Sequence, residues 1–212
     1  MRVFILCTGR TGSAAIIRAL GHCTNYSAGH ESQTTQLNAN RLNYADDHIE
    51  ADNRLSWQLA LLYAQYGDEA FYVHLTRNKE KVVNSFANRF YQPASIMDAY
   101  SSGVMKRPSG LLNKEQRHFV TNDYVENVNA NIAYFLKDRP NAMTIDLDQI
   151  DSDFPVFWEK IKAQGNLDAA LAEFRSRHNK TGKRKLNFLL HMKSTIAYEW
   201  KHFAMWLGLI KS

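Results

Sequence analysis

Three short apolar runs, spread along the chain, place the strongest constraint on what it can fold into. They cover residues 3–7, 70–75 and 142–147, and residues 24–27 form a weaker candidate of the same kind. Each run has the length and composition of a buried strand. The stretches between them carry apolar residues at helical spacing. Alternating strands and helices predict an α/β fold of three layers, α/β/α, around a mainly parallel sheet of about four to five strands.

The expected helices are marked by apolar residues three and four positions apart. This spacing runs over residues 55–66 and 120–135, and a longer amphipathic helix is expected over residues 186–207. The apolar face of the last helix predicts packing in the core rather than binding to a membrane surface. Ligands of parallel α/β sheets bind beyond the carboxyl ends of the strands, so a site is expected just after each strand.

The composition is that of a folded domain. The 212 residues are 45% hydrophobic and 22% charged, which predicts a single domain over residues 1–212. No apolar run is long enough to span a membrane, and residues 3–7 are too short for the core of a signal peptide. The two cysteines cannot form a disulfide framework and fit a reducing compartment. We therefore expect a soluble, cytoplasmic protein, with the oligomeric state left open.

The loop that follows the first predicted strand has the features of a phosphate cradle. Two glycines allow the backbone to approach an anion closely, and the helix that follows offers unpaired N–H groups at its start. Arg10 adds a full charge, and Thr11 and Ser13 add hydroxyl donors. It is not a Walker A loop, because no lysine follows Gly12. A tight turn with an exposed arginine is the alternative. The loop consists of Thr8, Gly9, Arg10, Thr11, Gly12 and Ser13.

The junction after the second apolar run is the most specific stretch of the chain. Arg77 follows the predicted strand, and Asn78 is placed to cap the next helix. Ser85 lies eight residues after Arg77, about two turns into that helix. A guanidinium and a hydroxyl in these positions can both donate to one phosphate. Each residue taken alone is equally compatible with an ordinary surface position.

These two motifs together resemble those of sulfotransferases that use 3′-phosphoadenosine 5′-phosphosulfate (PAPS). In that family a loop after the first strand binds the 5′-phosphosulfate, as residues 8–13 would here. An Arg and a Ser eight residues apart bind the 3′-phosphate, as Arg77 and Ser85 would. Residues 145–161 resemble a later strand, acidic loop and helix of the family. The resemblance implies PAPS as co-substrate, 3′-phosphoadenosine 5′-phosphate (PAP) as product, and no metal. Ala14 and Ala15 depart from the family pattern, so the adenine pocket is not assigned.

A basic stretch near the C-terminus contains most of the positive charge. The net charge is +5, while residues 175–185 alone carry six Lys and Arg and no acidic residue. No aromatic residue interrupts this run, which argues against single-stranded nucleic acid as a partner. A solvent-exposed loop with no ligand is the alternative. The resemblance implies a basic loop that closes over the 3′-phosphate. The residues that would do so are Lys180, Gly182, Lys183 and Arg184.

Sulfuryl transfer needs a general base near the acceptor, and residues 29–31 offer two. Glu31 is the first choice and His30 the second, because both follow the weak strand candidate. Arg10, with the N–H groups of its loop, is expected to stabilise charge on the leaving phosphate. The scattered histidines and the spacing of the cysteines predict no metal site.

Two other functions compete with a sulfotransferase. A kinase-like nucleotide phosphotransferase predicts a loop lysine, which the chain lacks after Gly12. A non-catalytic binder of adenosine bisphosphate or nucleic acid would retain Arg77 and Ser85 without depending on Glu31. The acceptor is expected to be a small molecule, glycan or lipid. Residues 92–113 are rich in Ser, Gly and Pro, and they form either a lid over the acceptor or a plain surface loop.

Overall fold

The computed structural model describes residues 1–90, 95–175 and 200. The described residues fall into two compact units, one built from residues 1–85 and 122–175 and the other from residues 86–121. The first unit contains the whole sheet. Apart from Trp200, the helix predicted over residues 186–207 lies outside the described residues. Within the described ranges, none of the helices has the length and apolar character needed to cross a bilayer.

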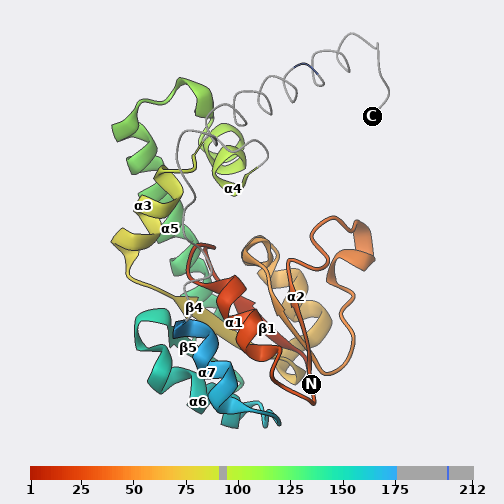
Figure 1. The fold of residues 1–212 in the computed structure, drawn as a ribbon. Helices are drawn as coiled ribbons and strands as arrows, with labels where there is room; N and C mark the ends of the chain where they lie inside the picture. The colour runs from red at the N-terminus through yellow and green to blue at the C-terminus, as the bar shows by residue number, and fades with distance from the viewer. Residues whose placement is uncertain (91–94, 176–199, 201–212) are drawn as a thin grey trace. The chain divides into compact units, whose positions relative to one another are not determined.

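A five-stranded sheet, parallel throughout, forms the centre of the first unit (Figure 1). The strand order is β2-β3-β1-β4-β5. Every strand therefore ends at the same edge of the sheet, and the crossover connections are long enough to hold helices. The expected α/β fold with a parallel sheet is confirmed. The strands are β1 (Val3–Leu6), β2 (Ser27–His30), β3 (His48–Ala51), β4 (Phe71–Thr76) and β5 (Ala142–Asp146).

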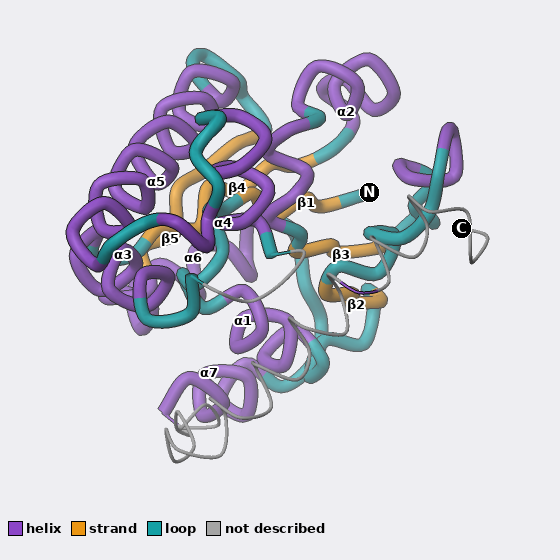
Figure 2. The backbone as a smooth tube through the Cα atoms, turned by 90° about the horizontal axis from the view of Figure 1, so that it is seen from above, coloured by secondary structure: helices purple, strands orange, loops and turns teal. Residues whose placement is uncertain are grey.

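Helices cover both faces of this sheet (Figure 2). On one face the core joins Val3 and Ile5 of β1 to the apolar sides of α1, α6 and α7. On the other face the ring of Phe4 lies 5.1 Å from that of Tyr66 on α2, and Tyr72 lies 5.3 Å from Phe135 on α5. The helices are α1 (Ser13–Leu20), α2 (Leu59–Tyr66), α3 (Lys79–Ala87), α5 (Lys114–Leu136), α6 (Ile150–Lys160) and α7 (Leu167–Arg175).

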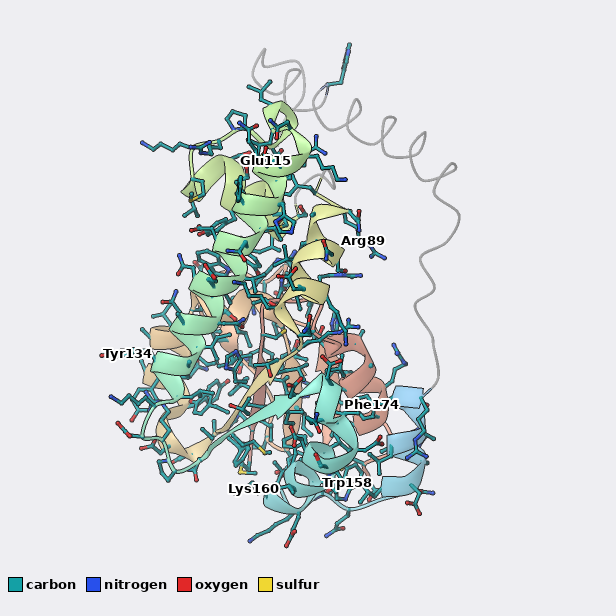
Figure 3. All side chains as sticks on the ribbon, turned by 90° about the vertical axis from the view of Figure 1, so that its left-hand side faces the viewer. Arg89, Glu115, Tyr134, Trp158, Lys160 and Phe174 are labelled. Carbon is teal, nitrogen blue, oxygen red and sulfur yellow. The ribbon has the colours of Figure 1, made fainter. Side chains whose placement is uncertain are left out.

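Aromatic contacts join α6 to α7 at the end of the first unit. The ring centroid of Phe154 lies 5.9 Å from that of Trp158 on the same helix and 5.1 Å from that of Phe174 on α7. Figure 3 labels Trp158 and Phe174 on these two helices. Phe154 is fully buried, so α6 and α7 share one apolar layer beneath the sheet.

Two sequence predictions about strands are wrong in detail. The strand expected over residues 24–27 lies at Ser27–His30, because Thr24 and Tyr26 instead bond to the segment before α7. The Thr24 amide donates to the carbonyl of Gln164, and the Tyr26 hydroxyl donates to the carbonyl of Ile161. Strand β3 was not predicted at all. Its four residues alternate polar and apolar side chains, and its length gives little periodic signal.

The helix expected over residues 55–66 is interrupted. Residues Asn53–Trp57 form the 3₁₀ helix η2, and α2 begins only at Leu59. The Asp52 carboxylate caps η2 by accepting a hydrogen bond from the amide of Arg54. Other short 3₁₀ segments are η1 (Asn38–Leu42), η3 (Gly67–Glu69) and η6 (Leu147–Gln149).

The segment predicted as an irregular loop over residues 92–113 is largely helical where it is described. The single turn α4 (Ile96–Asp98) continues into the π-helical segment η4 (Ala99–Val104), and η5 (Ser109–Leu111) follows. Met97 and Tyr100 are buried within this second unit, whereas Leu111 is exposed. The Ser101 hydroxyl donates to the carbonyl of Arg107 and closes the segment on itself. Residues 92–94 lie outside the described residues.

His74 in β4 makes the stability of the fold depend on pH. It is buried, and its Nε2 lies 3.1 Å from Oδ1 of Asn129. Burial lowers its pKa below the ordinary value of 6.5, and the bond to Asn129 only partly opposes this. The unfolded chain therefore takes up a proton at higher pH than the folded one, so the free energy of unfolding should fall as the pH drops below 6.5.

The His74→Gln variant tests this expectation by urea unfolding at a series of pH values. Glutamine keeps a polar side chain near Asn129 but does not titrate. The dependence of unfolding free energy on pH should become flatter between about pH 7 and pH 5. A variant with the slope of the unmodified protein would show that another group is responsible.

Candidate functional site

The residues that follow the five strands all lie at one edge of the sheet. Because the strands are parallel, their carboxyl ends share that edge, where ligands of such folds bind. The β1 end leads into the loop of residues 8–13, and the β4 end leads into Arg77. The β2 end leads into Glu31 and the β3 end into Asp52. The residues predicted from three separate parts of the sequence therefore come to one edge, together with Asp52, which the sequence analysis did not predict.

The backbone of the loop after β1 adopts left-handed conformations at three positions. The φ angles are 82° at Gly9, 62° at Arg10 and 99° at Gly12. Gly12 precedes α1, whose first turn has no side-chain cap. A Cβ atom at Gly12 would lie 2.7 Å from Cδ2 of Leu147, so a side chain there would be strained by its φ and would require Leu147 to shift. The N–H groups at the start of α1 are thus available to an anion.

Three side chains that the sequence analysis missed hold the start of this loop. The Ser56 hydroxyl donates to the carbonyl of Cys7 at 3.1 Å. The Tyr124 hydroxyl donates to the carbonyl of Thr8 at 2.7 Å, and the Asn53 amide also donates to it at 3.4 Å. These donors come from η2 and α5, 45 to 116 residues away in the sequence. They fix the start of the loop against η2 and α5.

Arg10, Arg77 and Ser85 form one cluster. The Nε atom of Arg10 donates to Oγ of Ser85 at 3.0 Å. A guanidinium nitrogen of Arg77 lies 3.5 Å from the carbonyl oxygen of Arg10. Nε of Arg77 is buried and has no hydrogen-bond partner within the described part of the chain. Two guanidinium groups and a hydroxyl therefore converge where β1 and β4 end, which is an arrangement suited to an oxyanion.

The helix that carries Ser85 is capped as the sequence predicts. Oδ1 of Asn78 accepts a hydrogen bond from the amide of Lys81 at 3.1 Å. Asp148, which follows β5, accepts a hydrogen bond from the Asn78 amide and pairs with Nζ of Lys81 at 2.7 Å. The hydrogen bond from Lys81 and that from the Asn78 amide hold the pKa of Asp148 below its usual value. These contacts fix the end of β4 against the end of β5 and so orient the start of α3.

The two predicted base candidates lie at the end of β2. Nε2 of His30 is 3.0 Å from Oγ of Ser13, so the end of β2 contacts the loop of residues 8–13 directly. Glu31 has a φ of 54°, and its carboxylate pairs with a guanidinium nitrogen of Arg54 at 3.0 Å. Arg54 follows β3, the strand that the sequence analysis missed. Because β3 was not predicted, the sequence analysis could not identify Arg54 as a partner of Glu31.

This architecture resembles that of a solved protein structure. No family model matches the chain, and no curated protein matches it. Among solved structures, the crystal structure of the mouse sulfotransferase SULT7A1 complexed with PAP matches with a TM-score of 0.50. The match covers 87% of this chain and 73% of the mouse chain at 11% sequence identity. The fold is sulfotransferase-like. At this identity the likeness establishes the fold alone, and the expected three-layer architecture is the part of the sequence analysis that it confirms.

The basic stretch predicted over residues 175–185 falls almost wholly outside the described residues of this sulfotransferase-like fold. Arg175 is described, and it pairs with Asp151 at 3.3 Å on the surface. Lys180, Gly182, Lys183 and Arg184 lie outside the described residues, and their role stays a prediction. Across the described ranges, no group of three or more His, Cys, Asp and Glu side chains is arranged to hold a metal ion.

Cys7 lies directly beneath the phosphate loop and should be unreactive in the native protein. Its side chain is fully buried, and its Sγ accepts a hydrogen bond from the Gly9 amide at 3.3 Å. Burial raises the pKa of the thiol to about 11, against smaller opposing effects from Thr11 and Gly9. Thiolate is the reactive form, so alkylation by iodoacetamide at about pH 8 should be at least 100-fold slower than in urea.

Peptide mass spectrometry after timed labelling measures this rate for Cys7 separately from Cys23. Both cysteines are free and buried, so both should be labelled in urea. Rapid labelling of Cys7 without denaturant would mean that the loop opens far more often than its hydrogen bonds imply.

Proposed function

We propose that the chain is a sulfotransferase that moves a sulfuryl group from PAPS to a hydroxyl or amine of an acceptor. The observation that carries the proposal is the Arg10–Ser85–Arg77 cluster at the ends of β1 and β4 of a sulfotransferase-like fold. Arg77 and Ser85 would bind the 3′-phosphate, and the buried unpaired Nε of Arg77 is the donor that an added anion would satisfy.

The loop after β1 would bind the 5′-phosphosulfate. Its left-handed backbone and the free first turn of α1 offer N–H groups to the bridging and terminal oxygens. Arg10 would also offset the charge that develops on the leaving phosphate. The basic residues after Arg175 would complete the 3′-phosphate site. The proposed donor-binding residues are Gly9, Arg10, Thr11, Gly12, Ser13, Arg77, Ser85, Lys180, Gly182, Lys183 and Arg184.

PAPS supplies the sulfuryl group when it is bound. The acceptor oxygen or nitrogen forms a bond to sulfur in line with the breaking bond between sulfur and the 5′-phosphate oxygen, and PAP leaves. Glu31 takes the acceptor proton as general base, with His30 as the second candidate. His30 ends β2 and Glu31 follows it, at the edge of the sheet where the loop lies, and His30 contacts Ser13 of that loop. The acceptor would be a small molecule, a glycan or a lipid.

Calorimetric titration with PAP tests the donor site. We expect micromolar binding, and Arg77→Ala should weaken it about 30- to 100-fold because a hydrogen-bonded charge is lost. Arg139→Ala is the matched control, since Arg139 lies over the rings of Tyr63 and Phe135 and pairs with Asp68. The control should bind PAP like the unmodified protein.

Two results would overturn parts of the proposal. No binding of PAP in the micromolar range would remove the sulfotransferase function. Binding that Arg77→Ala leaves intact would remove the 3′-phosphate assignment alone.

Turnover is then measured with PAPS across a panel of phenols, amines, saccharides and lipids. The Glu31→Gln variant should lose at least 100-fold in kcat, with its affinity for PAP retained. Binding without turnover on any acceptor would instead favour a non-catalytic adenosine-bisphosphate binder.

A further inference from the structure

Strand β3 and the residue that directly follows it carry two fully buried carboxylates. Glu50 and Asp52 are two positions apart, so they point to the same face of the sheet. Each accepts hydrogen bonds from the turn that follows β2. Glu50 accepts from the amide of Ser32 at 2.8 Å and from its hydroxyl at 2.5 Å, and Asp52 accepts from the hydroxyl of Thr34 at 3.1 Å. The two acids therefore hold the turn at alternate residues.

Glu50 is ionised in this position despite its burial. Burial opposes ionisation, but hydrogen bonds from His48 and from Ser32 outweigh it and hold the pKa below its ordinary value. Nε2 of His48 lies 3.0 Å from Oε2 of Glu50. Gly29 makes this approach possible, because a Cβ atom there would lie 2.6 Å from the same oxygen. A buried charge with several donors is expensive to displace, so the turn has one well-defined position.

This turn begins with Glu31, whose backbone is fixed on both sides. Its amide donates to the carbonyl of Ala51 at the end of β3, at 3.1 Å. The next residue, Ser32, is bound to Glu50 as described. The left-handed φ of 54° at Glu31 is uncommon for a residue with a side chain and persists because these contacts impose it. The direction in which the Glu31 side chain leaves the backbone is thereby set.

The far end of the same side chain is fixed by Arg54. Its guanidinium contacts Oε2 of Glu31 at 3.0 Å, and both side chains are about one third exposed, at 34% and 36%. The backbone amide of Arg54 donates to Oδ1 of Asp52 at 2.8 Å, while Oδ2 of Asp52 binds Arg41 at 2.6 Å and Thr34. The buried carboxylate of Asp52 thus binds both the turn that carries Glu31 and the backbone of Arg54, whose side chain pairs with the Glu31 carboxylate.

We propose that Arg54 is a positioning residue for Glu31, and that Asp52 sets the geometry of the pair. This inference rests on the proposed sulfotransferase function, in which Glu31 takes the acceptor proton. A glutamate side chain loses conformational entropy when it is held in one rotamer. Arg54 holds that rotamer before the acceptor binds, through one oxygen only. A general base must reach its proton within hydrogen-bond distance, and small displacements reduce the rate steeply.

A double-mutant cycle in kcat tests the inference. The variants are Arg54→Gln, Glu31→Gln and the pair together, measured with PAPS and the best acceptor of the panel. Arg54→Gln should lower kcat about 10- to 100-fold, and it should change PAP affinity by less than about twofold. In the Glu31→Gln background the same change should have almost no further effect, because Arg54 acts through Glu31.

Two further variants sharpen the result. Arg54→Lys should recover a substantial part of the lost kcat, because the contact is a single nitrogen to a single oxygen that an ammonium can also make. Arg2→Gln is the control, since Arg2 also pairs with a carboxylate, that of Asp46 at 2.8 Å, and is not part of the site. It should leave kcat unchanged. Arg54→Gln removes only an ion pair whose side chains are about one third exposed, and such a pair contributes little to stability, so the variant should fold.

The outcomes separate this inference from the function on which it rests. Equal losses of kcat from Arg54→Gln with and without Glu31 would overturn the positioning role and leave the sulfotransferase in place. A loss of PAP affinity that matches the loss of kcat would assign Arg54 to the donor site instead. A protein that binds PAP but transfers sulfuryl to no acceptor would overturn both the function and the inference.

Discussion

The Gly12→Val substitution is expected to abolish binding of PAP. Gly12 has a φ of 99°, a conformation that a β-branched residue does not adopt without strain. A side chain there would also meet Leu147, whose Cδ atoms lie 2.7 and 2.9 Å from the position of the Cβ. Either the Leu147 side chain or the loop must therefore shift, and a displacement of the loop backbone by about 1 Å should be enough for a 100-fold loss. Calorimetric titration with PAP measures the effect.

A graded series shows which of the two effects dominates. Gly12→Ala retains the strain of about 1–2 kcal/mol and a smaller overlap, so it should weaken PAP binding about tenfold. Adding Leu147→Ala relieves the overlap but not the strain, and it should restore only part of the affinity. Gly110→Val is the control, because nothing lies within 4 Å of a Cβ there and its φ is not in the left-handed region. Normal PAP binding by Gly12→Val would mean that the loop does not cradle the nucleotide.

The strands that the sequence predicts well are those that read as apolar runs, namely the central strands β1 and β4 and the edge strand β5. Central strands of a parallel sheet are covered on both faces and therefore read as continuous apolar runs. Residues of β1 such as Phe4 and Ile5 are fully buried for this reason. The edge strand β2 gives no such signal. The strand was predicted over residues 24–27 instead, because aromatic residues such as Tyr26 favour strands. In the structure its hydroxyl binds the carbonyl of Ile161, outside the sheet.

Strand β3 could not be predicted because its polar residues are satisfied by distant partners. A carboxylate at position 50 argues for exposure on any local criterion. Its burial depends on Ser32 and His48, and on the absence of a side chain at Gly29. No rule of sequence spacing predicts these contacts of Glu50. The sequence shows only a short segment of alternating polar and apolar residues, which also fits a surface loop.

The candidate site likewise contains some residues that local sequence predicts and others that depend on distant partners. Arg77 and Ser85 are predictable together because one strand end and one helix fix their spacing locally. The contact of Arg10 with Ser85 joins residues 75 positions apart, and the contact of Tyr124 with Thr8 joins residues 116 apart. Arg54 became visible only with β3. Local motifs thus indicate where a ligand can bind, while the side chains that support the motifs depend on the folded arrangement of the sheet.

The Asp52→Ala substitution should cause the largest loss of stability among changes near the site. Asp52 is fully buried and pairs with Arg41, whose side chain is 9% exposed, at 2.6 Å. Removal of one partner leaves a buried guanidinium without its counter-charge, which costs about 3–5 kcal/mol. It also frees the amide of Arg54 and the hydroxyl of Thr34. Urea unfolding followed by circular dichroism should show the midpoint falling with little change in slope.

A surface pair gives the matched comparison. Asp46→Ala breaks the pair with Arg2, whose separation of 2.8 Å is similar, but Asp46 is 78% exposed. Its loss should change the unfolding free energy by no more than about 1 kcal/mol. In an Arg41→Met background the Asp52→Ala change should be milder by about 1–3 kcal/mol, because the orphaned charge is gone. Equal losses from the buried and the exposed pair would show that Asp52 is not the anchor on which the turn of Glu31 and the start of η2 both depend.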